Sequence, residues 1–109
     1  MHSFAALADP TRRRIIELLS RGERSAGDIV DEFDMSASAI SQHLKVLREA
    51  KLVQMRVDAQ RRIYQLNSEG LSEMDDWLRN IRSFWGSRLD DLEHELRKPQ
   101  PNQRKRSKR

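Results

Sequence analysis

The chain has 109 residues, of which 37% are hydrophobic and 35% are charged, and it contains no cysteine. Disulfides, thiolate nucleophiles and thiolate metal sites are therefore excluded, and the length allows one compact domain. The net charge of +4 is unevenly placed, because residues 97–109 hold seven Lys and Arg residues and no acid, which leaves 14 basic and 17 acidic residues in 1–96. Affinity for a polyanion must come from local basic patches and from the C-terminal end.

No stretch of the sequence is long and apolar enough to span a bilayer, and residues 1–7 lack the pattern of a secretory signal. We therefore expect a cytoplasmic protein without a membrane partner. So polar a chain of this size is only marginally stable as a monomer, which favours self-association.

The first two predicted helices are marked by capping signals. Asp9 can accept a hydrogen bond from the first turn of a helix, and Pro10 suits that turn. Ser25, with Asp28 three residues later, resembles a capping box for a second, short helix that ends near Asp34.

Ser36 opens a third predicted helix that extends to Ala50. One of its faces is apolar, with Ile40, Leu44 and Leu47 at helical spacing, and the opposite face is polar. Residues 52–57 then alternate, and residues 63–66 follow a polar turn, so the sequence predicts a small β-hairpin.

A long helix is predicted from about residue 68 to 97, because apolar residues recur along one stripe. The stripe contains Leu71, Met74, Trp77, Leu78, Ile81, Phe84, Trp85, Leu89, Leu92 and Leu96. One interpretation assigns the stripe wholly to the core of one monomer, but so long a helix should extend beyond a body of three short helices and a hairpin. Its surplus, notably Trp77, Ile81, Phe84, Trp85 and Leu89, fits an isologous dimer. We place the folded domain at 1–97 and expect the proline-broken segment 98–109 to be a disordered basic tail.

Two short helices followed by a hairpin indicate a mainly α fold, a winged helix-turn-helix. The polar face of the third helix presents Ser38, Ser41, Gln42, His43 and Lys45. These side chains suit base edges in the major groove and a phosphate, and Gln42 is the best candidate for reading adenine. Further cations surround this face and the hairpin, where they can hold the DNA backbone or enter a minor groove: Arg48, Lys51, Arg56, Arg61 and Arg62.

Structural alternatives stand beside some of these assignments. His43 can equally be a packed histidine at the junction of two helices, and Ser36 is explained by capping alone. The run from Arg12 to Arg14 is more simply a solvated helix face than a set of phosphate contacts, although one of these arginines can pair with acids of the last helix.

Three segments give a specific resemblance: Ala6-Leu7-Ala8-Asp9-Pro10-Thr11-Arg12-Arg13-Arg14-Ile15, Ser38-Ala39-Ile40-Ser41-Gln42-His43-Leu44-Lys45-Val46-Leu47 and Arg61-Arg62-Ile63-Tyr64-Gln65-Leu66. They resemble the ArsR/SmtB family over roughly residues 4–96. The resemblance implies a homodimeric winged-helix repressor whose first and last helices, here with Leu7 and the surplus residues named above, form the dimer interface. It also implies that the helix with Ser41, Gln42 and His43 enters the major groove.

Departures from the family pattern indicate a member that does not sense metals. By our alignment, Ser25 and Gly27 stand where metal-sensing members have two cysteines. The nearest equivalents of a second family site are Asp90, Asp91, Glu93, His94 and Glu95, of which Asp90 and His94 are one turn apart. A lone pair is a poor metal site, so we expect no metal and no cofactor. The segment at Asp9 and the pair Phe84-Trp85 resemble metal-independent members more fully.

Two further departures affect backbone geometry. Lys51 stands where relatives usually have a glycine after the recognition helix, and the turn of the wing lacks their glycine. A left-handed Lys51 costs about 1 kcal/mol. The length of the wing turn, and with it the placement of Arg61 and Arg62, is left open.

The sequence therefore predicts a DNA-binding regulator of transcription. The expected function is sequence-specific binding of double-stranded DNA by a homodimeric repressor of a pseudo-palindromic operator, with autoregulation as the simplest hypothesis for its control. The alternative is a winged-helix protein-interaction module with only non-specific DNA affinity. An enzyme is not expected, because the chain has three scattered histidines, no thiol and no glycine-rich phosphate loop. No pattern identifies an effector.

Overall fold

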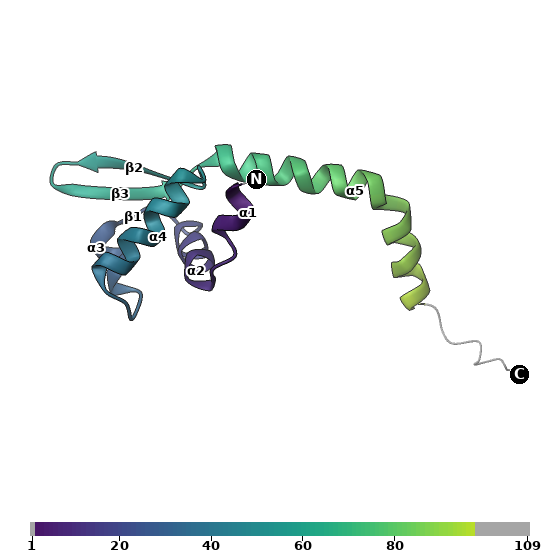
Figure 1. The fold of residues 1–109 in the computed structure, drawn as a ribbon, viewed down its shortest axis with the longest axis horizontal. Coiled ribbons are helices and arrows are strands. Elements are labelled where there is room, and N and C mark those ends of the chain that lie inside the picture. The colour runs from purple at the N-terminus through teal and green to yellow at the C-terminus, as the bar shows by residue number, and fades with distance from the viewer. Residues whose placement is uncertain (1, 98–109) are drawn as a thin grey trace, which may run out of the picture. The chain divides into compact units, whose positions relative to one another are not determined.

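The computed structural model describes residues 2–97, so the predicted tail at 98–109 lies outside the described residues. The helices and strands follow the order α1, α2, β1, α3, α4, β2, β3 and α5 along the chain (Figure 1). The first of two compact units ends at Asp76 and the second begins at Trp77. A mainly helical fold with a small sheet and a long C-terminal helix confirms the predicted fold class.

Three helices of the first unit begin at the predicted caps. α2 (Pro10–Leu19), α3 (Ala26–Asp31) and α4 (Ala37–Glu49) are each preceded by a polar residue in extended conformation, whose side chain accepts a hydrogen bond from a backbone N–H in the first turn. The acceptors are Asp9, Ser25 and Ser36, at 3.0, 3.1 and 3.1 Å from the donor nitrogens. These bonds satisfy N–H groups that have no partner within the helix.

The sheet has one strand more than the sequence predicts. β2 (Val53–Asp58) and β3 (Arg61–Leu66) form the predicted antiparallel hairpin, whose turn projects away from the helices (Figure 1). β1 (Arg24–Ser25) pairs with the other edge of β3, so the strand order is β1-β3-β2. A two-residue strand has too little alternation to be visible in the sequence. The short helix α1 (His2–Ala6) was not predicted either.

The core of the first unit fixes which face of α4 is left to solvent. Ile40, Leu44 and Leu47 are buried, in agreement with the predicted apolar face. They belong to a cluster that includes Ile15, Ile29, Leu52 and Val53, each at most 1% exposed. With about 1.5–3 kcal/mol for each large apolar side chain removed from water, this cluster sets the rotation of α4 about its axis.

Between residues 2 and 97, two residues other than glycine have a left-handed backbone. Lys51 has φ of 60° and Ala59 has φ of 59°. Lys51 follows α4 and has the left-handed geometry whose cost was considered from the sequence. Ala59 lies in the turn between the paired residues Asp58 and Arg61. The sequence left the length of the turn between β2 and β3 open, and this pairing shows that two residues separate the strands. Each left-handed residue costs about 1 kcal/mol relative to glycine.

The last helix, α5 (Ser68–Arg97), has the bounds that the sequence predicts. Its first turns lie in the first unit, where Leu71 and Met74 pack on the core. Among the helices of residues 2–97, none is long and apolar enough to cross a membrane.

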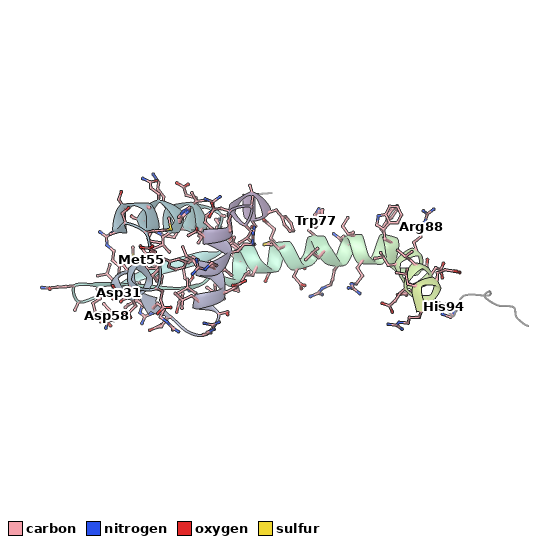
Figure 2. The ribbon with its side chains drawn as sticks, turned by 90° about the horizontal axis from the view of Figure 1, so that it is seen from below. Asp31, Met55, Asp58, Trp77, Arg88 and His94 are labelled. Carbon is pink, nitrogen blue, oxygen red and sulfur yellow. The ribbon has the colours of Figure 1, made fainter. Side chains whose placement is uncertain are left out.

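The described part of the second unit, residues 77–97, is the rest of α5. Its apolar stripe is exposed, including Trp77, Ile81, Phe84, Trp85 and Leu89. Phe84 is 78% exposed and meets Trp85 edge to face at 5.2 Å between ring centroids, and the guanidinium of Arg88 lies over the Trp85 ring. Figure 2 labels Trp77 and Arg88, which extend away from the helix. A row of large exposed apolar side chains is unusual on a monomer surface.

Candidate nucleic-acid interface

The exposed face of α4 carries most of the residues predicted to bind DNA. Ser38, Ser41, Gln42, Lys45 and Arg48 are all exposed; helical spacing places Ser38, Gln42 and Lys45 opposite the buried face, and Ser41 and Arg48 beside it. The short hydroxyl and amide side chains precede the two cations along the chain. Such a face can offer hydrogen bonds to base edges near the start of the helix and positive charge toward its end.

A groove lies between α4 and the hairpin, and it brings five of the predicted residues together. Its volume is about 590 Å³, and its lining includes Ser41, Gln42, Lys45, Arg48 and Arg62. Tyr64, Gln54 and Asn67 add neutral polar groups, and Glu49 is the one acid of the lining. Three cations against one carboxylate give this groove a net positive charge.

The cations of the groove are not used to hold the fold of residues 2–97. Within residues 2–97, no hydrogen bond or ion pair joins the side chains of Lys45, Arg48 or Arg62 to another protein group. Three cations that converge with only one acid in the lining, and with no ion pair among them, repel one another and keep their hydration, so they favour a polyanionic ligand. We refer to Lys45, Arg48 and Arg62 as the groove cations.

Other cations that the sequence placed around the site have acidic partners. Arg56 donates two hydrogen bonds to the carboxylate of Glu23, at 2.8 and 2.7 Å, and these bonds lower the pKa of Glu23. Lys51 Nζ lies 3.0 Å from Glu69 Oε2. Arg56 therefore ties the hairpin to the segment before β1, a role that residue spacing did not reveal because its partner is 33 residues away.

Arg61 and His43 lie outside the lining of the groove. Arg61 is exposed on β3, and its guanidinium is 3.9 Å from Asp28. The Nδ1 atom of His43 is 3.3 Å from an Nη atom of Arg12 and 3.9 Å from Asp9 Oδ2, so the ring faces the start of α2. These contacts support the packed alternative for His43.

The arginines of α2 are engaged with the end of α1. Arg12 Nε donates to the carbonyl of Ala6 at 2.6 Å, and Arg13 donates to the carbonyl of Leu7 at 2.8 Å. The guanidinium of Arg14 lies over the ring of Phe33. Arg13 and Arg14 are exposed, in agreement with a solvated helix face, and their guanidinium groups also contact a backbone carbonyl and an aromatic ring.

The acids of α5 do not form a metal site in the described part of the chain. Among residues 2–97, no three His, Asp or Glu side chains converge in a way that can hold a metal ion. Asp90 and His94 are exposed on α5.

Comparison with known proteins places this geometry in a family. Residues 9–55 match the family described as "Bacterial regulatory protein, arsR family". The chain is 39% identical over 78 residues to the transcriptional repressor SdpR of Bacillus subtilis, covering 72% of this chain and 87% of that protein. It is 44% identical over 83 residues to the HTH-type transcriptional regulator Rv2034 of Mycobacterium tuberculosis, covering 76% of this chain and 75% of the relative.

A solved structure agrees with the sequence comparison. The crystal structure of a possible transcriptional regulator for arsenical resistance superposes with a TM-score of 0.70 at 40% identity, covering 87% of this chain and 96% of that one. The matched family segment contains α2, α3 and α4, which carry the helix-turn-helix and its exposed polar face. The chain therefore belongs to the ArsR family, and it is a winged helix-turn-helix protein that binds DNA and regulates transcription.

Proposed function

We propose that this chain is a homodimeric repressor that recognises a pseudo-palindromic operator. The observation that carries the proposal is the convergence of the groove cations beside the exposed hydroxyl and amide groups of Ser41 and Gln42. In this account α4 enters the major groove, where Gln42 reads an adenine through the two hydrogen bonds that its amide can make. The phosphate backbone runs along the groove between α4 and the hairpin.

The exposed stripe of α5 supports the dimer. From Trp77 onward it presents aromatic and branched apolar side chains to solvent, of which Phe84 and Leu89 are 78% and 49% exposed. Aromatic residues are enriched at the centres of protein interfaces, and a second copy of the same stripe is a complementary partner in a two-fold contact. We assign Trp77, Ile81, Phe84, Trp85 and Leu89 to this contact, with Leu7 as its predicted member in the first unit.

A dimer presents two copies of α4, so its operator contains two half-sites related by a two-fold axis. Their centres are expected to lie one or two helical turns apart, with about 10 bp in each turn. Occupancy of such a site at a promoter excludes RNA polymerase, which is the proposed basis of repression. Binding to its own promoter makes the level of the protein self-limiting, and this autoregulation is part of the proposal.

The test is selection of bound duplexes from a random pool, repeated with Gln42→Ala. We expect the wild type to enrich a pseudo-palindrome and Gln42→Ala to lose preference at one position in each half-site. Each such position is worth about 1–3 kcal/mol of discrimination. If no sequence is enriched and affinity is equal for all duplexes, the operator-binding proposal fails and a winged-helix protein-interaction module takes its place.

A further inference from the structure

The C-terminal end of α4 is closed by a left-handed residue. Lys51, with φ of 60°, donates its N–H to the carbonyl of Arg48, and Leu52 donates to the carbonyl of Leu47, both at 3.0 Å. This is the bonding pattern of a Schellman motif. The motif ends the helix and turns the carbonyls of Ala50 and Lys51 toward groups outside α4.

Both carbonyls receive hydrogen bonds from segments outside the helix-turn-helix. The N–H of Gly70, in the first turn of α5, donates to the carbonyl of Lys51 at 2.8 Å. The buried hydroxyl of Ser3, in α1, lies 3.4 Å from the carbonyl of Ala50. The recognition helix is thus attached at its end to α1 and α5.

Gly70 allows this attachment because it has no side chain. A Cβ atom at Gly70 would lie 2.5 Å from the carbonyl oxygen of Lys51 and 2.8 Å from that of Ala50. Both are backbone atoms, so no side-chain rotation relieves the overlap. Any other residue at this position must move the start of α5 away from the end of α4.

A second contact holds the same joint from the solvent side. Lys51 Nζ is 3.0 Å from Glu69 Oε2, and the backbone N–H of Glu69 donates to Asn67 Oδ1 at 2.9 Å. The side chain of Lys51 and its carbonyl therefore bind consecutive residues of α5. These contacts stabilise a residue whose left-handed backbone is unfavourable by itself.

We propose that Gly70 is a positioning residue for DNA recognition, which seats α5 on the end of α4 and so sets the orientation of the recognition helix. The inference rests on the proposed operator binding. It adds that a change at this joint alters where the two copies of α4 meet DNA, although Gly70 is buried and outside the groove. The measurable consequence is a change in the preferred spacing of half-sites together with a loss of operator affinity.

The experiment compares wild type, Gly70→Ala and Gly86→Ala on the selected operator and on versions with one base pair added to or removed from its centre. Gly86 is the matched control, because it is also in α5 and a Cβ there has no atom within 4 Å. We expect Gly70→Ala to bind the operator at least about tenfold more weakly, to change its spacing preference, and to keep its affinity for unrelated duplex DNA. Gly86→Ala should behave as wild type in all three measurements.

Either of two outcomes overturns the inference: wild-type affinity and spacing preference for Gly70→Ala, or an equal loss on operator and unrelated DNA. Failure of the wild type to select any operator is a separate result, which defeats the proposed function instead. If Gly70→Ala does not fold, the joint is tested in the wild type by hydrogen exchange at the Gly70 amide. Operator binding should slow this exchange at least about tenfold, and an unchanged rate contradicts the proposal.

Discussion

Arg56 and Glu23 form a two-point contact. The guanidinium of Arg56, in β2, donates hydrogen bonds of 2.8 and 2.7 Å to the two carboxylate oxygens of Glu23, which lies just before β1. Parallel bonds of this kind fix orientation as well as distance. The contact joins β2 to the segment leading into β1, across the intervening strand β3. It therefore holds the hairpin in the position that forms one wall of the groove.

We predict that this contact makes the stability of the folded chain fall as the pH is lowered into the acid range. Its hydrogen bonds hold the pKa of Glu23 below the ordinary value of 4.5, so the folded state favours the carboxylate more than the unfolded state does. The stabilisation is present above pH 4.5 and is lost as the pH falls through the folded pKa. Melting temperatures of wild type and Glu23→Gln should therefore differ at pH 7 and converge toward pH 3. A difference that is constant over this range would count against the contact.

We predict that Ala59→Gly stabilises the protein. Ala59 has φ of 59° in the turn of the hairpin, where glycine carries no steric penalty. The expected gain is about 0.5–1 kcal/mol in the free energy of unfolding, measured by urea denaturation. Ala37→Gly is the control, because Ala37 is exposed at the first position of α4 and a glycine there should destabilise. A loss of stability in Ala59→Gly would contradict the left-handed turn.

His43→Ala is expected to lower stability, whereas Ser41→Ala is expected to weaken DNA binding. Because Nδ1 of His43 faces Arg12 and Asp9, its loss should lower the free energy of unfolding by about 1 kcal/mol and leave the base preference unchanged. Ser41 is exposed in the groove, so its substitution should leave the free energy of unfolding unchanged and lower the affinity for the operator. Denaturation and operator titration separate the two effects. An altered base preference in His43→Ala would restore the alternative in which this histidine reads DNA.

The dimer is tested by placing a charge within the exposed stripe of α5. Ile81 is 39% exposed, so Ile81→Glu leaves the charge hydrated in a monomer but buries it in the proposed contact. Sedimentation should show a dissociation constant at least about tenfold higher than that of the wild type. Ser83→Glu places the same charge on the opposite side of the helix and should leave the dimer intact. Equal effects of the two substitutions would exclude this stripe as the interface.

Local signals in the sequence predicted most of the fold. The caps at Asp9, Ser25 and Ser36 are determined by residues within one helical turn, and the buried face of α4 follows from its periodicity, so both were confirmed. β1 was missed because it consists of Arg24 and Ser25 alone, and its pairing with β3 depends on residues almost forty positions away.

The site was less predictable than the fold, because its electrostatics depend on distant pairs. Charge patterning placed Arg56 with the groove cations, whereas the folded chain pairs it with Glu23. Neither the bonds from Arg12 to the end of α1 nor the close approach of Gly70 to Lys51 has a local sequence signal. The exposed polar face of α4, in contrast, could be read directly from the sequence.

Binding of DNA in the groove is tested by the salt dependence of operator binding when the groove cations are neutralised. A variant with Lys45, Arg48 and Arg62 changed to Gln should lower the slope of log affinity against log salt by about three, since each cation that neutralises a phosphate contributes roughly one unit. Arg21→Gln removes a cation from a separate hollow that it shares with Glu17 and Glu32, and it should keep the wild-type slope. If the triple variant keeps the wild-type slope, the groove between α4 and the hairpin does not bind the DNA backbone.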